Sequence, residues 1–284
     1  MKHLIVMLGV MGVSLSPIFV RFSTAPSMVL VFYRVTFATL LLTPYVLWRH
    51  RDEVKSMERK ALLLCLLAGV FLGLHFTSYF ESLRHTTIAA AVVLVDTEVF
   101  FVALGSVLFL RQRLTRRAWT AIAVTFVGSV MVAAAGTGGG GNALWGNLLA
   151  LSGALFMTGY TVIGVVCRRT LSNTVYTYLG YWTSALTVLV LALASGTPLT
   201  GYGAVNFATA AAMAVLCTLL GHSVFNWALK YLPPAFVSTV KLLEPVISAL
   251  WGLLIFREVP GLSVVLGGAL TIFGIALYSR ESEN

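Results

Sequence analysis

The chain has 284 residues, of which 58% are hydrophobic and 10% are charged, and its formal net charge is +9. Soluble domains contain about 25% charged residues, so this composition excludes a soluble globular protein. The positive charge does not indicate nucleic-acid binding, because the basic residues lie in short segments between long apolar stretches.

Apolar segments long enough to cross a bilayer recur along the whole chain. A spanning helix needs roughly 20 mostly apolar residues, and the sequence predicts ten of them, separated by short polar stretches. The predicted spans are residues 4–20, 28–48, 61–80, 88–110, 118–135, 144–167, 174–194, 205–228, 235–256 and 262–278. The predicted fold class is therefore an all-α polytopic membrane protein.

The distribution of basic residues predicts the orientation. Cytoplasmic segments of membrane proteins carry an excess of Lys and Arg. If the N-terminus is cytoplasmic, the inner segments include the basic stretches 49–60 and 111–117, whereas the outer segments hold only three basic residues: Arg21, Arg84 and Arg257. Both termini are therefore predicted to lie in the cytoplasm, with the protein in a bacterial-type inner membrane.

The two halves of the chain match each other at a fixed offset of 146 residues. The matched pairs are Leu83 with Leu229, Ala89 with Ala235, Glu98 with Glu244, Ala103 with Ala249, Arg111 with Arg257 and Gly128 with Gly274. The glutamate pair carries most weight, because a glutamate inside a span is rare. The offset predicts two five-helix repeats, residues 1–135 and 144–284, joined by a Gly-rich linker at 136–143.

Each predicted repeat contains an odd number of spans, so the two repeats cross the membrane in opposite senses. Inverted repeats of this kind are typical of transporters, in which two equivalent gates exchange conformations around a midplane site. The Gly-rich linker lacks the Lys-Ser/Thr ending of a phosphate-binding loop. The three cysteines, Cys65, Cys167 and Cys217, also lack the paired spacing of a disulfide or a metal site. No cofactor and no metal are expected.

Several local sequences resemble the EamA-type permeases of the drug/metabolite transporter superfamily. They are Phe32-Tyr33-Arg34-Val35-Thr36-Phe37-Ala38, Leu74-His75-Phe76 with Ser82-Leu83, and Leu243-Glu244-Pro245-Val246 with Phe256-Arg257-Glu258. The resemblance implies a basket of ten helices around a central cavity, with the fifth and tenth helices peripheral. It also implies export of amino acids, related metabolites or toxic organic cations. The first half departs from the family pattern, with Glu98-Val99 where a proline is common and Arg111-Gln112 where Gly-Glu is common.

Five ionisable residues lie well inside predicted spans, where a charge costs roughly 2.5–3.5 kcal/mol on insertion scales and therefore needs a cavity or a partner. They are Arg34, Asp96, Glu98, Lys241 and Glu244. Lys241 and Glu244 are three residues apart and share a face of a regular helix, whereas Asp96 and Glu98 point about 200° apart and cannot both face one cavity without distortion. The offset places Glu98, Lys241 and Glu244 together near the midplane.

Two interpretations of these charges stay open for Glu98 and Glu244. One carboxylate could exchange protons as substrate binds, or the charges could form a structural cluster of ion pairs. For Asp96 and Arg34 structural pairing is favoured. His75 and Tyr79, four residues apart in the third predicted span, are expected to line the cavity.

A second polar pair with the same spacing lies in the eighth predicted span. His222 and Asn226 are four residues apart and therefore share a helical face. Polar residues in spans often hydrogen-bond to neighbouring helices, so these two are expected to join helices rather than to bind substrate.

The sequence therefore predicts a secondary transporter or exporter of amino acids, related metabolites or organic cations that works by alternating access. Glu98, Glu244 and Lys241 would set its charge selectivity, in a monomer or a weak homodimer. A passive facilitator or uniporter of the same substrates is the alternative, and protons are a partner only if transport is coupled. A remote alternative is an intramembrane hydrolase, since Ser238 and Lys241 have Ser/Lys spacing, but the accompanying motifs are absent.

Overall fold

A computed structural model describes residues 2–86, 91, 94–134, 143–257 and 261–282, and the secondary structure of this part of the chain is helical throughout. The helices of the first half are α1 (Lys2–Val13), α2 (Ser16–Phe22), α3 (Ser27–Arg49), α4 (Arg51–Lys55), α5 (Arg59–His85), α7 (Glu98–Leu108) and α8 (Arg116–Ala134). Those of the second half are α9 (Ala143–Cys167), α10 (Asn173–Ala194), α11 (Ala204–Ala212), the π-helix η1 (Met213–His222), α12 (Ser223–Ala228), α13 (Pro234–Lys241), α14 (Glu244–Phe256) and α15 (Leu262–Ser282).

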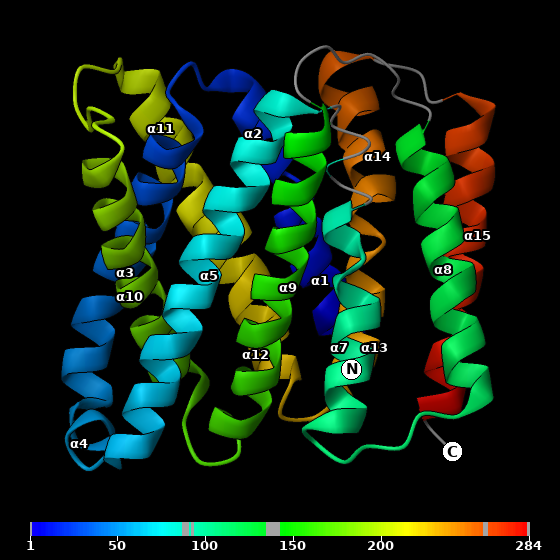
Figure 1. Cartoon of the computed structure of the whole chain (residues 1–284), viewed down its shortest axis with the longest axis horizontal. Coiled ribbons are helices and arrows are strands. Elements are labelled where there is room, and N and C mark those ends of the chain that lie inside the picture. Colours follow the sequence, from blue (N-terminus) through cyan, green and yellow to red (C-terminus); the bar gives the residue numbers. More distant parts are fainter. Residues whose placement is uncertain (1, 87–90, 92–93, 135–142, 258–260, 283–284) are drawn as a thin grey trace.

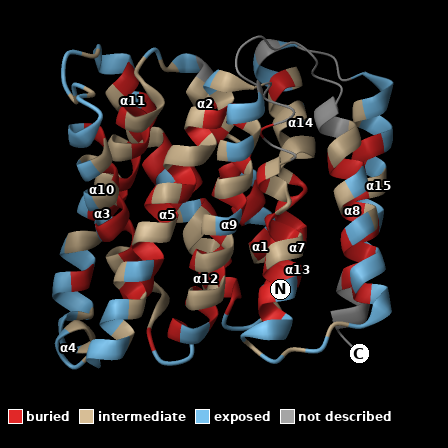
Figure 2. Ribbon diagram, viewed as in Figure 1, coloured by how far each residue is buried: buried red, intermediate tan, exposed pale blue. Residues whose placement is uncertain are grey.

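The helices run side by side in one bundle, with α8 and α15 together at one edge (Figure 1). Six helices of the described chain are long and apolar enough to cross a membrane, and shorter apolar helices cover Leu4–Val20 and Leu262–Tyr278. Buried residues gather on the inner helix faces (Figure 2), while large apolar side chains such as Phe109, Leu254 and Leu262 are exposed. This pattern is that of a polytopic membrane protein whose outer surface contacts lipid.

A described helix overlaps each of the ten predicted spans. The fourth span is described only in part, because residues 87–90 and 92–93 lie outside the described chain. The predicted linker at 136–143 also lies outside it, except for Ala143, which is the first residue of α9. The number of spans therefore stays a prediction.

Two helices are interrupted at positions that differ by the 146-residue offset. The fourth predicted span turns at Thr97, and α7 begins at Glu98. The ninth is interrupted at Leu242 and Leu243, and α14 begins at Glu244, followed by Pro245, which has no N–H to donate to the preceding turn. Each glutamate thus lies in the first turn of a half-helix, where the helix dipole stabilises a negative charge.

The contact between α8 and α15 is built on small residues and occurs twice. A Cβ atom on Gly128 would lie 2.5 Å from Thr271 Oγ1 and 2.6 Å from the Gly267 carbonyl oxygen. A Cβ atom on Gly274 would lie 2.7 Å from the backbone nitrogen of Thr125. Thr125 and Gly128 are the counterparts of Thr271 and Gly274 at the 146-residue offset, so the two contacts are equivalent.

Replacing Gly274 with alanine is expected to lower the melting temperature of the purified protein in detergent. The added methyl group would meet backbone atoms of Thr125, which can move only if α8 shifts, and overpacking of this kind costs about 1–3 kcal/mol. Gly153→Ala is the matched control, because its nearest neighbours would lie 3.6 Å away, at ordinary contact distance. Equal melting temperatures for the two variants would contradict the prediction.

Arg111 and Arg257 are another pair related by the offset, and both adopt left-handed backbone conformations, with φ of 56° and 58°. Arg257 ends α14, and its N–H donates to the Gly252 carbonyl. Glycine is the residue that reaches this conformation without a steric penalty. This conformation explains why glycine is common at the position of Arg111 in the proteins that this sequence resembles. In this chain an arginine adopts it instead.

Candidate functional site

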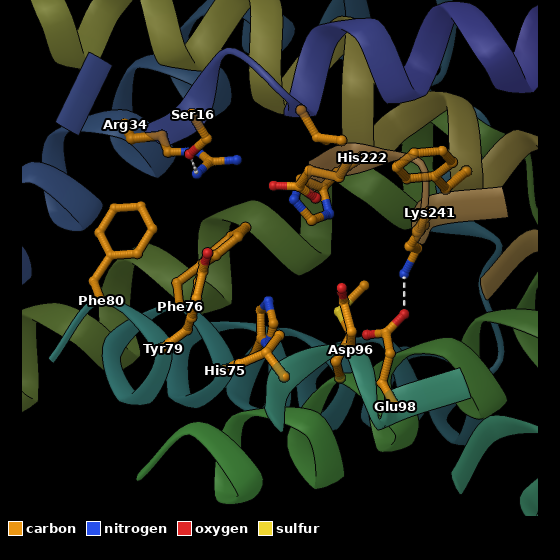
Figure 3. Close-up of a pocket in the computed structure, with 15 residues that line it drawn as sticks. Ser16, Arg34, His75, Phe76, Tyr79, Phe80, Asp96, Glu98, His222 and Lys241 are labelled. Carbon is orange, nitrogen blue, oxygen red and sulfur yellow. Dashed lines mark hydrogen bonds and ion pairs between the residues drawn. The ribbon is translucent and has the colours of Figure 1, made fainter. Parts of the chain in front are cut away.

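A cavity of about 610 Å³, counting the space open to solvent, lies where the interrupted helices meet (Figure 3). All of the residues predicted for the site line it: Arg34, His75, Tyr79, Asp96, Glu98, Lys241 and Glu244. They come from α3, α5, α7, α13 and α14, except for Asp96, which lies in the helical residues just before the turn at Thr97. The cavity is therefore formed by both halves of the chain.

Lys241 and Glu98 form a buried ion pair between the halves. Lys241 Nζ donates to Glu98 Oε1 over 2.7 Å, and the side chains are only 11% and 7% exposed. Lys241 ends α13 and Glu98 begins α7, so each charge also has the favourable sign for its own helix terminus. Lys241 Nζ lies 5.4 Å from the centre of the Phe225 ring.

The helix interruptions change the faces predicted from sequence spacing. Lys241 and Glu244 do not lie on one regular helix, because α13 ends at Lys241 and α14 begins at Glu244. Asp96 and Glu98 both line the cavity, and the turn at Thr97 between them supplies the distortion that a shared face requires. All four residues line the cavity, although neither pair lies on one regular helix.

Arg34 is buried, but it makes no ion pair with any described residue. Its Nε donates to Thr218 Oγ1 over 2.7 Å, one terminal nitrogen donates to Ser16 Oγ over 3.4 Å, and its guanidinium carbon lies 4.4 Å from the centre of the Phe76 ring. The other terminal nitrogen, Nη2, is buried without a hydrogen-bond partner. The structural pairing expected for Arg34 is therefore not found in the described chain.

The two remaining carboxylates differ in their contacts. Asp96 Oδ2 accepts a hydrogen bond from Ser129 Oγ over 3.0 Å. The Glu244 carboxylate has no hydrogen bond and no ion pair to any residue in the described ranges, although it interacts electrostatically with Lys241, Arg34 and Glu98. Glu244 is thus the acid in the cavity that is left available for another partner.

His75 Nδ1 donates to the Gly153 carbonyl over 3.0 Å, which fixes the orientation of the ring, and the Tyr79 ring stacks on it at 6.3 Å between centroids. His222 also lines the cavity, and its Nδ1 is buried without a hydrogen-bond partner. Of His222 and Asn226, which were both expected to hydrogen-bond to neighbouring helices, only Asn226 does so among the described residues. Its side-chain amide donates to Tyr160 Oη over 2.5 Å. The π-helical stretch that ends at His222 changes the helix phase, which spacing rules for a regular α-helix do not foresee.

The sequence profile of the EamA-like transporter family matches residues 1–134 and again residues 144–280, which together cover almost the whole chain. The chain belongs to the EamA-like transporter family. This EamA-like protein is therefore a multi-pass membrane transporter and not an enzyme. The remote hydrolase interpretation is wrong, and Lys241 is bound to Glu98.

Relatives of this EamA-like transporter match over most of their length. The pseudopaline exporter CntI of Pseudomonas aeruginosa is 26% identical over 263 residues, covering 92% of this chain and 89% of CntI. An uncharacterized transporter of Archaeoglobus fulgidus is 25% identical over 256 residues, covering 89% and 87%. A solved crystal structure with 15% identity covers 100% of this chain and 99% of its own, with a TM-score of 0.81, and shows the fold alone.

Outside the predicted spans, a hydrogen-bond network joins α4 to the start of α10. Glu53 accepts from the Ser172 backbone N–H over 2.5 Å and from His50 Nδ1 over 2.8 Å. Ser172 also caps α10 by accepting from the Val175 N–H. Burial raises the pKa of Glu53, but the hydrogen bonds from Ser172 and His50 outweigh it, so its pKa lies below the ordinary 4.5.

Glu53→Gln is expected to destabilise this transporter at neutral pH and to leave it unchanged in strong acid. A lowered carboxyl pKa contributes stability that is complete above about pH 4.5 and is lost as the pH falls through the lowered value. Melting temperatures measured from pH 7 to pH 3 should therefore converge for the two proteins. Glu58→Gln is the control, because this exposed glutamate makes no capping hydrogen bond. A constant difference across the pH range would contradict the assignment.

Proposed function

We propose that this transporter exports a small amino-acid-like metabolite by alternating access through the cavity between two inverted five-helix repeats. The observation that carries the proposal is the cavity itself, in which charged side chains from both halves of the chain converge. Charged groups inside a membrane domain mark substrate or ion pathways by default. One chain supplies all of the described lining, so a monomer suffices for the site.

Equivalent features at the 146-residue offset support the inverted repeat. The helix interruptions at Glu98 and Glu244 correspond, as do the reciprocal contacts of Gly128 and Gly274 in the α8–α15 pair. Interrupted helices at a central site, with their first turns facing the cavity, are a recurring arrangement in secondary transporters. Rocking of one repeat against the other would expose the cavity to each side of the membrane in turn.

The orientation and the direction of transport rest on charge and on a relative. The excess of Lys and Arg on one set of loops supports an orientation in the inner membrane with both termini in the cytoplasm. CntI is named as an exporter, which supports the outward direction for this chain. An uncoupled uniporter would use the same cavity, and the response to a proton gradient separates it from a coupled carrier.

Counterflow in proteoliposomes tests the proposal. Vesicles loaded with a mixed pool of amino acids and small organic cations would be diluted into a buffer that contains the same compounds in labelled form, with and without a pH gradient. Protein-free vesicles are the control. Saturable exchange is expected, and acceleration by the gradient would identify proton coupling. Flux that does not saturate would indicate a channel, and the absence of exchange for every compound would overturn the proposal.

A further inference from the structure

The charges in the cavity are not equally available to a ligand. Lys241 and Glu98 satisfy each other at 2.7 Å, and Asp96 already accepts from Ser129. Among the charged side chains of the described ranges that line the cavity, two keep a group without a hydrogen bond: Arg34 at its Nη2 atom and Glu244 at its carboxylate. The described lining of the cavity therefore offers one positive and one negative group to a ligand.

The contacts of Arg34 leave its Nη2 atom without a hydrogen-bond partner among the described residues. Thr218 and Ser16 fix two of its nitrogens, and the Phe76 ring supports the plane of the guanidinium. A guanidinium presents N–H donors in a rigid fork that matches a carboxylate. A buried donor without a partner is unfavourable, so this edge of Arg34 fits an acceptor that arrives with the substrate.

Glu244 provides the complementary group. It lies in the first turn of α14, lines the same cavity as Arg34 and interacts with it electrostatically. A cationic ligand without a carboxylate would leave Arg34 Nη2 unpaired, and an anionic ligand without an amine would leave Glu244 unpaired. Only a molecule with both groups satisfies both residues at once.

We infer that the transported molecule is an amino-carboxylate zwitterion whose carboxylate binds Arg34 and whose ammonium group binds Glu244, while the Lys241–Glu98 pair is not a ligand. The inference rests on the proposed transport function and names its substrate class. Of the two cations among the described residues that line the cavity, Arg34 is the anion site, because Lys241 is already paired with Glu98. Loss of a charge-assisted hydrogen bond weakens binding roughly tenfold or more, so analogues that lack either group should be excluded.

Counterflow with three separate pools tests the inference: the proteinogenic amino acids, the amines formed by their decarboxylation, and the acids formed by their deamination. Mass spectrometry of the vesicle contents gives exchange for each compound. We expect exchange of one or more amino acids at least tenfold faster than that of the matched amines and acids. The same preference should appear as an increase in melting temperature on addition of the transported amino acid in detergent.

Arg34→Lys is the decisive variant, because it keeps the charge and loses the fork. We expect at least a tenfold loss of amino-acid exchange in a protein that still folds, as judged by its melting temperature, whereas Arg113→Lys on an exposed loop should exchange like the parent. Equal exchange of amines and amino acids, or an unaffected Arg34→Lys variant, would overturn the inference and leave the transport function standing. Absence of exchange in all pools would overturn both.

Discussion

Lys241→Met alone is expected to be one of the most destabilising single substitutions in this transporter. It keeps most of the volume of the side chain but leaves the Glu98 carboxylate, 7% exposed, without its cation. Breaking a buried ion pair by removing one partner costs about 3–5 kcal/mol, because the remaining charge stays buried and uncompensated. The melting temperature and the yield of monodisperse protein in detergent should both fall clearly.

The double variant Glu98→Gln/Lys241→Met tests whether the instability of Lys241→Met comes from the unpaired Glu98 charge or from the loss of Lys241 itself. Replacing both partners of a buried pair by groups of similar shape is often neutral, so the double variant should recover most of the stability lost in Lys241→Met. It should also keep amino-acid exchange if the pair is structural rather than a ligand. A double variant as unstable as the single one would show that Lys241 acts through other contacts, such as the Phe225 ring at 5.4 Å.

The sequence was sufficient to identify the charged residues that meet in the cavity, although not to place Asp96 beside Glu98 or His222 in its wall. Long apolar segments are recognisable from composition alone, and the cost of a charge in lipid makes Arg34, Asp96, Glu98, Lys241 and Glu244 converge on a polar interior. The match of the two glutamates at one offset then indicated that the two halves meet there. These inferences rest on physical effects that depend little on local geometry.

The sequence was not sufficient to predict which charges pair. Three-residue spacing suggested that Lys241 and Glu244 share a face, but the interruption at Leu242 and Leu243 ends the regular helix between them. Lys241 instead reaches Glu98, a contact 143 residues away along the chain. Such a pairing depends on how two half-helices pack, which no local pattern encodes.

The prediction that His222 hydrogen-bonds to a neighbouring helix is wrong for a similar reason, because the residue lines the cavity. It ends the π-helix η1, whose wider turn alters the direction of the side chains that follow. Its predicted partner Asn226 does join helices, through Tyr160. Proline is the usual sequence signal of an irregular helix, and the stretch Met213–His222 contains none.

Glu244→Gln is expected to change stability and transport in opposite directions. The parent carries a half-buried carboxylate in the cavity that has no hydrogen bond and no ion pair within the described chain, and a charge partly removed from water without a bonded partner is unfavourable in the folded state. An amide of the same shape removes that charge, so the melting temperature should stay the same or rise. Loss of a charge-assisted contact to the substrate ammonium corresponds to about 1.5–3 kcal/mol, so exchange should fall roughly tenfold to a hundredfold.

The opposite signs are what distinguish a binding residue from a structural one. Residues whose environment is unfavourable for folding are retained where function requires them, and Glu244 would be such a residue beside the satisfied pair of Lys241 and Glu98. Melting temperature and counterflow measured on the same preparation decide the question, with Asp96→Asn as the comparison, because Asp96 already accepts from Ser129. Glu244→Gln could instead lower the melting temperature, with exchange falling only in proportion to the amount of folded protein. In that case Glu244 stabilises the helix packing, and another group binds the substrate ammonium.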